Sequence, residues 1–277
     1  MLTFKSIKSK IILFFIILGV SFSSGCSDGA SIGDLNLFSI SDDVQLGQQV
    51  VTEMRKDQQN YPVYNNQQAT AYVQQIMDEI IQSPLVKYRN EFNYKITLIN
   101  TETINAFALP GGYIHVYKGL LKYIDNEATL AAILAHEVAH AERRHATKRM
   151  TKAYGAQFLL GLLLGQNPSQ IEEIAANLAS GLGFLYNSRE DEYEADEFSF
   201  KYLQATRWYP GAGKFFFEKI QGQQGSNSSL EELFSTHPLD QKRIDALDKL
   251  IQDAKLGNPS ESNVFTTRYN DFKKTLN

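Results

Sequence analysis

The sequence predicts an α+β fold that is mostly helical and contains one small β-sheet, and three observations lead to this prediction. Apolar residues recur at helical spacing between residues 67 and 81. A run rich in alanine and leucine follows Asn126, which can cap a helix, and continues to residue 140. Tyr94, Ile96 and Leu98 alternate with polar residues, as in a half-buried strand. The sequence shows no internal repeat of the length found in repeat proteins, so we expect one globular domain.

The first 25 residues are predicted to be a lipoprotein signal peptide that is not part of the fold. Three lysines lie within residues 1–10, residues 11–20 are apolar, and Ser23-Ser24-Gly25 places small residues before Cys26. This pattern resembles a bacterial lipobox with Cys26 as the lipidated residue, although Ser23 replaces the usual aliphatic residue. The alternatives are an ordinary secretory signal and an uncleaved membrane anchor. Cys26 is the only cysteine, so no intramolecular disulfide can form.

The charge of the chain argues against some classes of partner. Removal of residues 1–25 takes away three lysines and no acidic residue. The formal net charge then changes from -4 to 24 basic minus 31 acidic residues, or -7. An acidic domain is a poor match for nucleic acid or for anionic lipid, because either would need a basic surface. We therefore expect no nucleic-acid partner.

Residues 26–40 are predicted to form a lipidated tether and residues 41–277 the folded domain. In chain order, the elements expected in the domain are a helix over 44–54 capped by Ser41, a helix over 67–81, a strand over 92–99, strands over 107–109 and 113–117 joined by Pro110-Gly111-Gly112, a helix from 127 through 140, a helical segment around 188–196 and a helix over 239–250. The apolar run of residues 156–165 is too short to span a bilayer. It belongs either to a buried helix or to a hairpin, residues 159–185, that covers the cleft as a lid. Phe265, Tyr269 and Phe272 in the tail are expected to pack on the body.

The segment His136-Glu137-Val138-Ala139-His140 fits the pattern HExxH and is the most informative stretch of the chain. Residues i and i+4 share one face of a helix, so His136 and His140 can both direct a ring nitrogen at one metal ion. Glu137 projects about 100° around the helix, toward a water molecule held there. The pattern therefore predicts one zinc ion per chain and Glu137 as the general base that activates the water. The alternative is two ordinary histidines, one packed and one solvated.

A second acidic segment, about fifty residues downstream, offers the third ligand that a catalytic zinc requires. Glu192 and Asp196 are four residues apart in a segment of helical composition. One carboxylate can bind the metal while the other accepts a hydrogen bond from a ligand imidazole. The alternative is a solvated acidic helix face. We predict Glu192 as the third metal ligand and Asp196 as the residue that orients a histidine.

Four ordered motifs resemble those of the gluzincin metallopeptidase family that includes HtpX, the CAAX prenyl protease and Oma1. They are HExxH at 136–140, ExxxD at 192–196, a segment like the family's NAF-x-x-PGG at 105–112 and a Thr-His-Pro segment at 236–238, within a resemblance that runs from about residue 46 to 251. The resemblance implies a gluzincin-type domain in which the edge strand of the small sheet borders the cleft. An exposed edge at Asn105, Ala106 and Phe107 could bind substrate by adding an extended peptide as a further strand. A turn role for Asn105 is the alternative.

His237 and Arg243 complete the predicted site. By its position, His237 could stabilise the oxyanion as a catalytic residue, or occupy the fourth zinc position and silence the enzyme until substrate displaces it. A histidine that merely caps a helix is the third interpretation. Arg243, one turn into the following helix, could orient either partner. His115 and His145 lack a second ligand at metal spacing, so we expect them to be structural.

The resemblance is strongest to bacterial periplasmic lipoproteins, and it implies a zinc-dependent endopeptidase of the bacterial cell envelope that degrades misfolded or stalled outer-membrane proteins. The expected location is the periplasmic side, lipid-anchored through Cys26, and Ser27 favours the outer membrane because an inner-membrane retention signal would place aspartate there. Expected partners are unfolded or misassembled envelope polypeptides, the membrane, and a second copy of the chain or the outer-membrane assembly machinery. The alternative functions are a metal-binding chaperone with little proteolysis and a zinc amidase acting on cell-wall peptide.

Overall fold

The computed structural model describes residues 35–154, 168–180, 186–222 and 228–276. The signal peptide, Cys26 and most of the predicted tether lie outside these ranges, as does much of the predicted lid. Of the predicted lid, the structure describes a helix, α7 (Pro168–Ser180), which packs against α1 (Ile40–Lys56). None of the helices in the described ranges is both long and apolar enough to cross a membrane.

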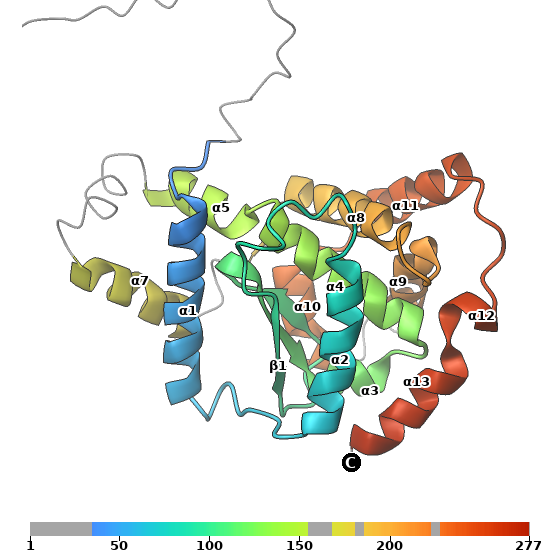
Figure 1. Cartoon of the computed structure of the whole chain (residues 1–277), viewed down its shortest axis with the longest axis horizontal. Helices are drawn as coiled ribbons and strands as arrows, with labels where there is room; N and C mark the ends of the chain where they lie inside the picture. The colour runs from blue at the N-terminus through green and yellow to red at the C-terminus, as the bar shows by residue number, and fades with distance from the viewer. Residues whose placement is uncertain (1–34, 155–167, 181–185, 223–227, 277) are drawn as a thin grey trace, which may run out of the picture. The chain divides into compact units, whose positions relative to one another are not determined.

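The domain is mostly helical with one three-stranded sheet, as predicted (Figure 1). Besides α1 and α7, the helices in the described ranges are α2 (Gln67–Ile80), α3 (Lys118–Tyr123), α4 (Glu127–Glu142), α5 (His145–Tyr154), α8 (Arg189–Leu203), α9 (Gly213–Gln221), α10 (Glu231–Thr236), α11 (Gln241–Asp253), α12 (Glu261–Val264) and α13 (Thr266–Lys273). Short 3₁₀ turns are η2 (Pro110–Gly112), η4 (Pro210–Ala212), η5 (Ser228–Leu230) and η6 (Lys274–Leu276).

The sheet has the strand order β1-β3-β2, which places β2 at an edge. Its strands are β1 (Lys95–Ile99), β2 (Ala106–Ala108) and β3 (Tyr113–Tyr117), with β1 parallel and β2 antiparallel to β3. The first strand begins three residues later than predicted, because the Phe92 N–H bonds to the carbonyl of Tyr88 and so belongs to a turn.

The predicted turn between β2 and β3 depends on glycine. Gly111 has φ 74° and Gly112 has φ 91°, backbone angles that residues with a Cβ rarely adopt. A Cβ on Gly111 would lie 2.7 Å from the Cα of Val44, so α1 packs directly on this turn. The helix α1 itself begins earlier than predicted. Its N-cap is Ser39, whose side chain accepts from the N–H of Asp42, so the prediction of Ser41 as the cap was wrong.

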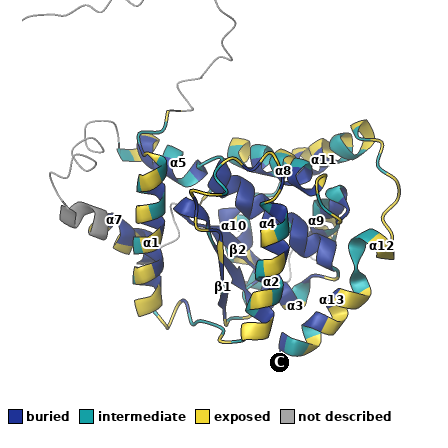
Figure 2. Ribbon diagram, viewed as in Figure 1, coloured by how far each residue is buried: buried dark blue, intermediate teal, exposed yellow. Residues whose placement is uncertain are grey.

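Helix α4 lies at the centre of the domain, and every one of its residues except Ile133 is buried (Figure 2). It packs against α8, α2, α9 and β2. Asn126 caps it as predicted, accepting from the N–H of Thr129. The C-terminal tail closes one side of the same core, because Tyr269 and Phe272 are buried as predicted and Phe265 is partly buried. The most protected helix of the domain therefore carries the HExxH segment.

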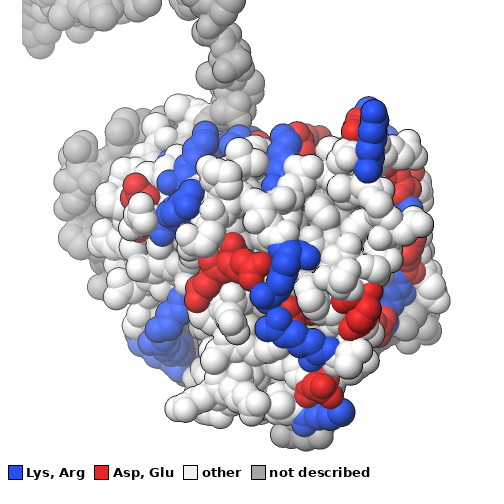
Figure 3. Space-filling model, turned by 45° about the vertical axis from the view of Figure 1, so that its right-hand side comes forward, with Lys and Arg blue, Asp and Glu red and all other residues white. Residues whose placement is uncertain are grey.

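Charged side chains of both signs are interspersed on the face shown in Figure 3. Surface ion pairs in the described ranges include Lys219 with Asp125 and Lys214 with Asp248. The arginines that follow the HExxH segment also have acidic partners, Asp43 for Arg144 and Asp191 for Arg149. Arg143 pairs with Glu194.

Candidate metal centre and active site

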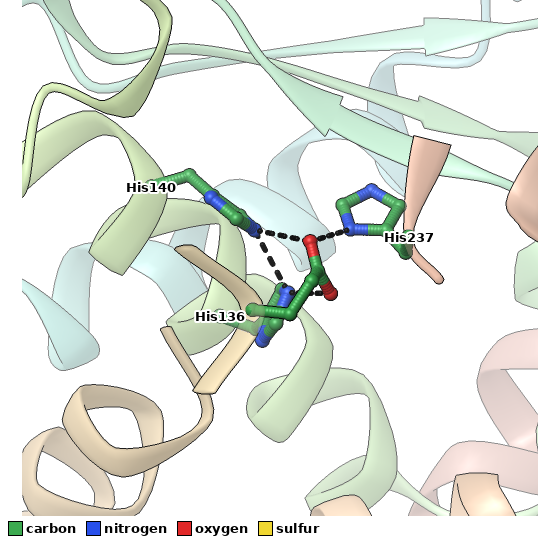
Figure 4. Close-up of side chains that lie close together, drawn as sticks. His136, His140 and His237 are labelled. Carbon is green, nitrogen blue, oxygen red and sulfur yellow. Dashed lines mark hydrogen bonds and ion pairs between the residues drawn. The ribbon is translucent and has the colours of Figure 1, made fainter. Parts of the chain in front are cut away.

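Three side chains from two helices converge in the arrangement that a zinc ion requires (Figure 4). The Nε2 atoms of His136 and His140, both on α4, lie 2.9 Å apart. Glu192 on α8 places Oε2 3.4 Å from His136 Nε2 and Oε1 3.2 Å from His140 Nε2. Ligand atoms arranged tetrahedrally around zinc are about 3.3 Å apart, given metal–ligand distances of about 2.0–2.2 Å. The three residues therefore fit a zinc ion with little rearrangement.

Close packing of α4 on α8 brings these ligands together. Ala135, Ala139 and Ala195 are completely buried, and such small side chains let the two helices approach. Ser188 caps α8 in a capping box with Asp191, so the helix begins at Arg189, three residues before the ligand Glu192. The sequence predicted both helices and the cap at Asn126 but not the cap at Ser188, and the tertiary contact between the helices adds the metal geometry.

His136 is held by a carboxylate and a buried arginine. Asp196 Oδ1 lies 2.9 Å from His136 Nδ1, a contact through which it could orient a ligand histidine. Arg243 bonds to both oxygens of Asp196 at 2.7 and 2.8 Å and lies 2.6 Å from Glu192 Oε2. Burial opposes the ionisation of Asp196 and Glu192, yet the nearby cations hold the pKa of each carboxyl below its ordinary value, with His237 and Arg243 acting on Glu192.

His140 is held differently, by His145, which was predicted from the sequence to have only a structural role. His145 Nδ1 lies 2.7 Å from His140 Nδ1, and His145 Nε2 lies 2.8 Å from Glu194 Oε2. Burial lowers the pKa of both His140 and His145, which favours their neutral forms. Glu194 also accepts from Arg143 at 2.8 Å. The expectation for His145 was therefore incomplete, because it touches a ligand histidine.

The spacing of five residues between His140 and His145 gave no sign of this contact. Five positions along a continuous helix would not bring two side chains together. The chain leaves the helix instead, because Arg144 has φ 58° and separates α4 from α5. Asn187 was also missed. Its side-chain nitrogen lies 3.3 Å from His140 Nε2 and 3.4 Å from His237 Nδ1. Only the folded chain brings these residues to the centre.

Glu137 lies between the predicted metal centre and the sheet. It is 2% exposed, and burial raises the pKa of its carboxyl above the ordinary value. The N–H of Ala108 donates to the carboxylate, while Glu137 Oε2 has no hydrogen-bond partner among the described residues. One oxygen of this buried carboxylate is free and lies beside the metal ligands. Glu137 is therefore suited to accept a proton from a water molecule in the site.

The edge strand β2 borders this site with its backbone. The carbonyl of Asn105 accepts from the N–H of Tyr117, and the N–H of Leu109 donates to Tyr113, so odd-numbered residues bond to β3. The polar backbone groups of Ala106 and Ala108 therefore point away from the sheet. The carbonyl of Ala106 lies 3.2 Å from His237 Nε2.

The side chains of this segment are not exposed, contrary to the expectation for Asn105, Ala106 and Phe107. They are 0%, 2% and 1% exposed. Asn105 Oδ1 accepts from the N–H of Ala106 and its Nδ2 donates to Glu232, while Phe107 stacks on His115 at 4.9 Å. What faces the site is the edge of the backbone. The side chains hold that edge in place.

His237 reaches the same centre from the end of α10. Its backbone forms the C-cap of α10, yet its ring points into the site, with Nδ1 3.1 Å from Glu192 Oε1 and Nε2 3.6 Å from Glu137 Oε1. Burial disfavours the charged ring, but the carboxylates of Glu192 and Glu137 raise the pKa of His237. Helix capping alone does not explain this position. The four residues His136, His140, Glu192 and His237 form one group that could hold a metal ion.

An apolar cavity of ≈ 60 Å³ opens beside Glu137 and His237. Its walls come from α4, α8, α9, α10 and α11, and the apolar side chains that line it include Ile133, Phe200, Phe216, Phe217, Leu233 and Leu247. The cavity lies on the side of the site where Arg243 is found, and it gives a bound molecule an apolar surface next to the catalytic residues.

Comparison with known proteins agrees with this geometry. The chain matches the family model described as Peptidase family M48 over residues 67–251. It is 28% identical over 225 residues to the Beta-barrel assembly-enhancing protease of Escherichia coli (strain K12), which covers 78% of this chain and 45% of that protein. It is 30% identical over 189 residues to the Mitochondrial metalloendopeptidase OMA1 of Schizosaccharomyces pombe, which covers 68% of this chain and 54% of that protein. The chain spans about half the length of these curated relatives.

The matched region contains each part of the centre described above. The HExxH helix, Glu192, Asp196, His237 and Arg243 all lie within residues 67–251. This stretch is more than half of the chain, so the match covers most of the folded domain. The chain belongs to Peptidase family M48, a family of zinc-dependent metallopeptidases.

Proposed function

We propose that this protein is a zinc-dependent endopeptidase of the bacterial cell envelope that degrades misfolded or stalled outer-membrane proteins. One observation carries the catalytic part of the proposal. The metal-binding group of His136, His140 and Glu192 lies directly beside Glu137 and the backbone edge of β2 that faces away from the sheet. Ligands, base and a place for a peptide backbone thus meet within one small volume.

The chemistry follows from the position of each residue. His136, His140 and Glu192 would hold zinc, which acts as a Lewis acid on the scissile carbonyl and lowers the pKa of a water molecule. Glu137 accepts a proton from the attacking water and delivers it to the leaving amine. Asp196 and Arg243 fix the orientation of His136 and Glu192, so that the ligand atoms need not reorganise during the reaction.

The edge of β2 supports a polypeptide as the substrate. An extended peptide that pairs with the outward groups of Ala106 and Ala108 would bind through its backbone, with little dependence on its sequence. For this pairing, Ala106 must give up its hydrogen bonds to His237 Nε2 and Asn105 Oδ1, and Ala108 its bond to Glu137. Substrate binding and movement of His237 are therefore linked in the proposed complex.

Both functional interpretations of His237 are compatible with this link. As a fourth ligand, His237 would occupy the position that the substrate needs, and His237→Ala should then raise the basal cleavage of an unfolded substrate. As the group that stabilises the oxyanion, its loss should lower kcat by about 100-fold or more with little change in zinc content. Zinc content and kcat, measured together, separate the two roles.

The envelope location rests on the N-terminal sequence and on the relatives. The pattern before Cys26 is that of a lipid-anchored protein on the periplasmic side, with the outer membrane favoured. The name of the Escherichia coli relative includes the assembly of β-barrels, which supports misassembled outer-membrane proteins as substrates and the assembly machinery as a partner. A second copy of the chain is the other partner that we propose.

The test uses the mature protein with zinc and the variant Glu137→Gln, which keeps the size of the side chain but cannot accept the proton. We expect wild type to cut casein and the variant to lose at least about 100-fold in turnover while it retains zinc and fold. Glu190→Gln, an exposed glutamate on α8, is the matched control and should behave as wild type. Activity of Glu137→Gln within threefold of wild type would reject the mechanism.

The same pair of proteins tests the cellular role. Envelope proteins that accumulate in cells with Glu137→Gln, but not with Glu190→Gln, identify the substrates. Enrichment of misassembled outer-membrane proteins would support the proposal. Wild-type protein that binds these polypeptides without cutting them would indicate a chaperone, and cleavage of peptidoglycan but not casein would indicate an amidase.

A further inference from the structure

His140 contacts His145, a further histidine that has no role in the proposed reaction. His145 begins α5, and its side chain is 1% exposed. Its Nδ1 faces Nδ1 of His140 at 2.7 Å, while its Nε2 faces Glu194 Oε2 at 2.8 Å. The ring is thus placed between a metal ligand and a carboxylate, with each nitrogen in hydrogen-bond contact.

The contacts allow one arrangement of protons when zinc is bound. His140 directs Nε2 at His136 and Glu192, so that nitrogen must be free of a proton to bind the metal. The proton of neutral His140 then lies on Nδ1 and is donated to His145 Nδ1. His145 can accept there only if its own proton lies on Nε2, and that proton is donated to Glu194.

We propose that His145 and Glu194 form a relay that fixes the ring orientation and the tautomer of the zinc ligand His140. His145 is a positioning residue in this proposal, since it touches neither the metal nor the substrate. A ligand histidine usually donates its second N–H directly to a carboxylate, a carbonyl or water. Here a neutral imidazole stands between the ligand and the carboxylate.

The backbone supports this role. Arg144 adopts φ 58°, a conformation that residues other than glycine rarely take, and this turn brings His145 back onto His140. The side chain of Arg144 bonds to Asp43 and to the carbonyls of Phe38 and Ser39. Strained backbone of this kind persists only where its surroundings hold it in place. The N-terminal segment therefore helps to hold the turn that presents His145.

Glu194 is fixed from the other side. Arg143 donates to Glu194 Oε1 through Nε at 2.8 Å, which leaves Oε2 to accept from His145. The two oxygens thus have separate partners. Arg143 also lies over the ring of Phe198 at 4.7 Å, so its guanidinium is held on α8 as well. The acceptor at the end of the relay has a defined position.

The test measures zinc affinity by competition with a chromophoric chelator. His145→Phe fills the same space without an acceptor and should weaken zinc binding about 10- to 100-fold. His145→Asn places its side-chain oxygen near the position of Nδ1 and should stay within threefold of wild type. His115→Phe, which replaces another buried histidine away from the ligands, is the control and should not change the affinity. Affinity of His145→Phe within threefold of wild type, or an equal loss in His145→Asn, would overturn the relay.

A second measurement needs no variant and therefore remains decisive if His145→Phe does not fold. Ring ¹⁵N spectra of the zinc-loaded protein, labelled at histidine, should show the proton of His140 on Nδ1 and that of His145 on Nε2. A His145 ring protonated on Nδ1 would contradict the proposal. This inference rests on the zinc site of the proposed function but not on peptide cleavage, so the outcome is distinct from that of the casein test.

Discussion

The two histidines of the HExxH segment lie one helical turn apart, yet the protein supports them in different ways. His136 donates directly to Asp196, and Arg243 holds that carboxylate from the interior. His140 contacts His145, whose carboxylate partner Glu194 is 30% exposed. The support of His136 is an ion pair in the interior of the domain. The support of His140 is longer and ends near the surface.

The difference has an energetic consequence. Arg243 is 4% exposed and compensates the carboxylates of Glu192, which is fully buried, and Asp196, which is 11% exposed; both would be costly to leave unpaired. On the other side, the ion pair of Arg143 with Glu194 is screened by solvent, and such pairs contribute little to stability. We expect Asp196 and Arg243, which support His136, to contribute most to the stability of the folded centre. We expect His145 and Glu194, which support His140, to affect zinc affinity with less effect on the stability of the fold.

The largest effect should come from removing either ligand, because the comparison assumes that both histidines bind the metal. Purified wild type should carry about one zinc per chain, and His136→Ala or His140→Ala should carry almost none, since two remaining ligands hold the ion poorly. Elemental analysis after dialysis measures this. Full zinc content in either variant would remove that histidine from the site.

The next largest effect is a difference in the free energy of unfolding between variants of Arg243 and Arg143. Arg243→Leu leaves the buried carboxylate of Glu192 and the mostly covered one of Asp196 without their cation and should cost about 3–5 kcal/mol of unfolding free energy. Arg143→Leu breaks an ion pair whose partners are both 30% exposed and should cost about 0–1 kcal/mol. Urea unfolding of the metal-free proteins compares them. Equal losses in the two variants would contradict the difference in depth.

The His136 side could be predicted from the sequence, because local spacing encodes it. Two histidines four residues apart share a helix face, and Asp196 lies one turn after Glu192 on another helix. Arg243 was proposed from its position one turn into the helix that follows the Thr-His-Pro segment. The caps at Asn126 and Ser188 fix where both helices begin, so the register of the ligands was already determined locally.

The His140 side could not be predicted, because it depends on contacts between distant segments. The position of His145 requires the left-handed backbone of Arg144, which is held by residues about a hundred positions earlier in the chain. The burial of Asn105 and Phe107 was missed for a similar reason, since Glu232 and His115 cover them only in the folded domain. The position of this segment at an edge of the sheet was predicted correctly, but its exposure was not.

A smaller effect compares the two carboxylates that support the histidines. Asp196→Asn removes the charge that acts directly on His136 and should weaken zinc binding about 10-fold or more. Glu194→Gln acts on His140 only through His145 and keeps an acceptor oxygen, so we expect less than tenfold. Competition titration with zinc gives both values under the same conditions. A larger loss in Glu194→Gln than in Asp196→Asn would reverse the order of the two supports.

The smallest effect should come from Arg144→Lys, which asks how far the His140 side extends into the N-terminal segment. Lysine keeps the charge next to Asp43 but lacks the planar fork that reaches Phe38 and Ser39 together. The segment should loosen, so hydrogen exchange at the amides of residues 38–43 should become faster, while zinc affinity falls by less than threefold. Faster exchange with unchanged affinity would confine this contact to anchoring the N-terminus. Loss of affinity as large as that in His145→Phe would instead make residues 38–43 part of the support of the metal centre, because the turn at Arg144 connects this segment to His145.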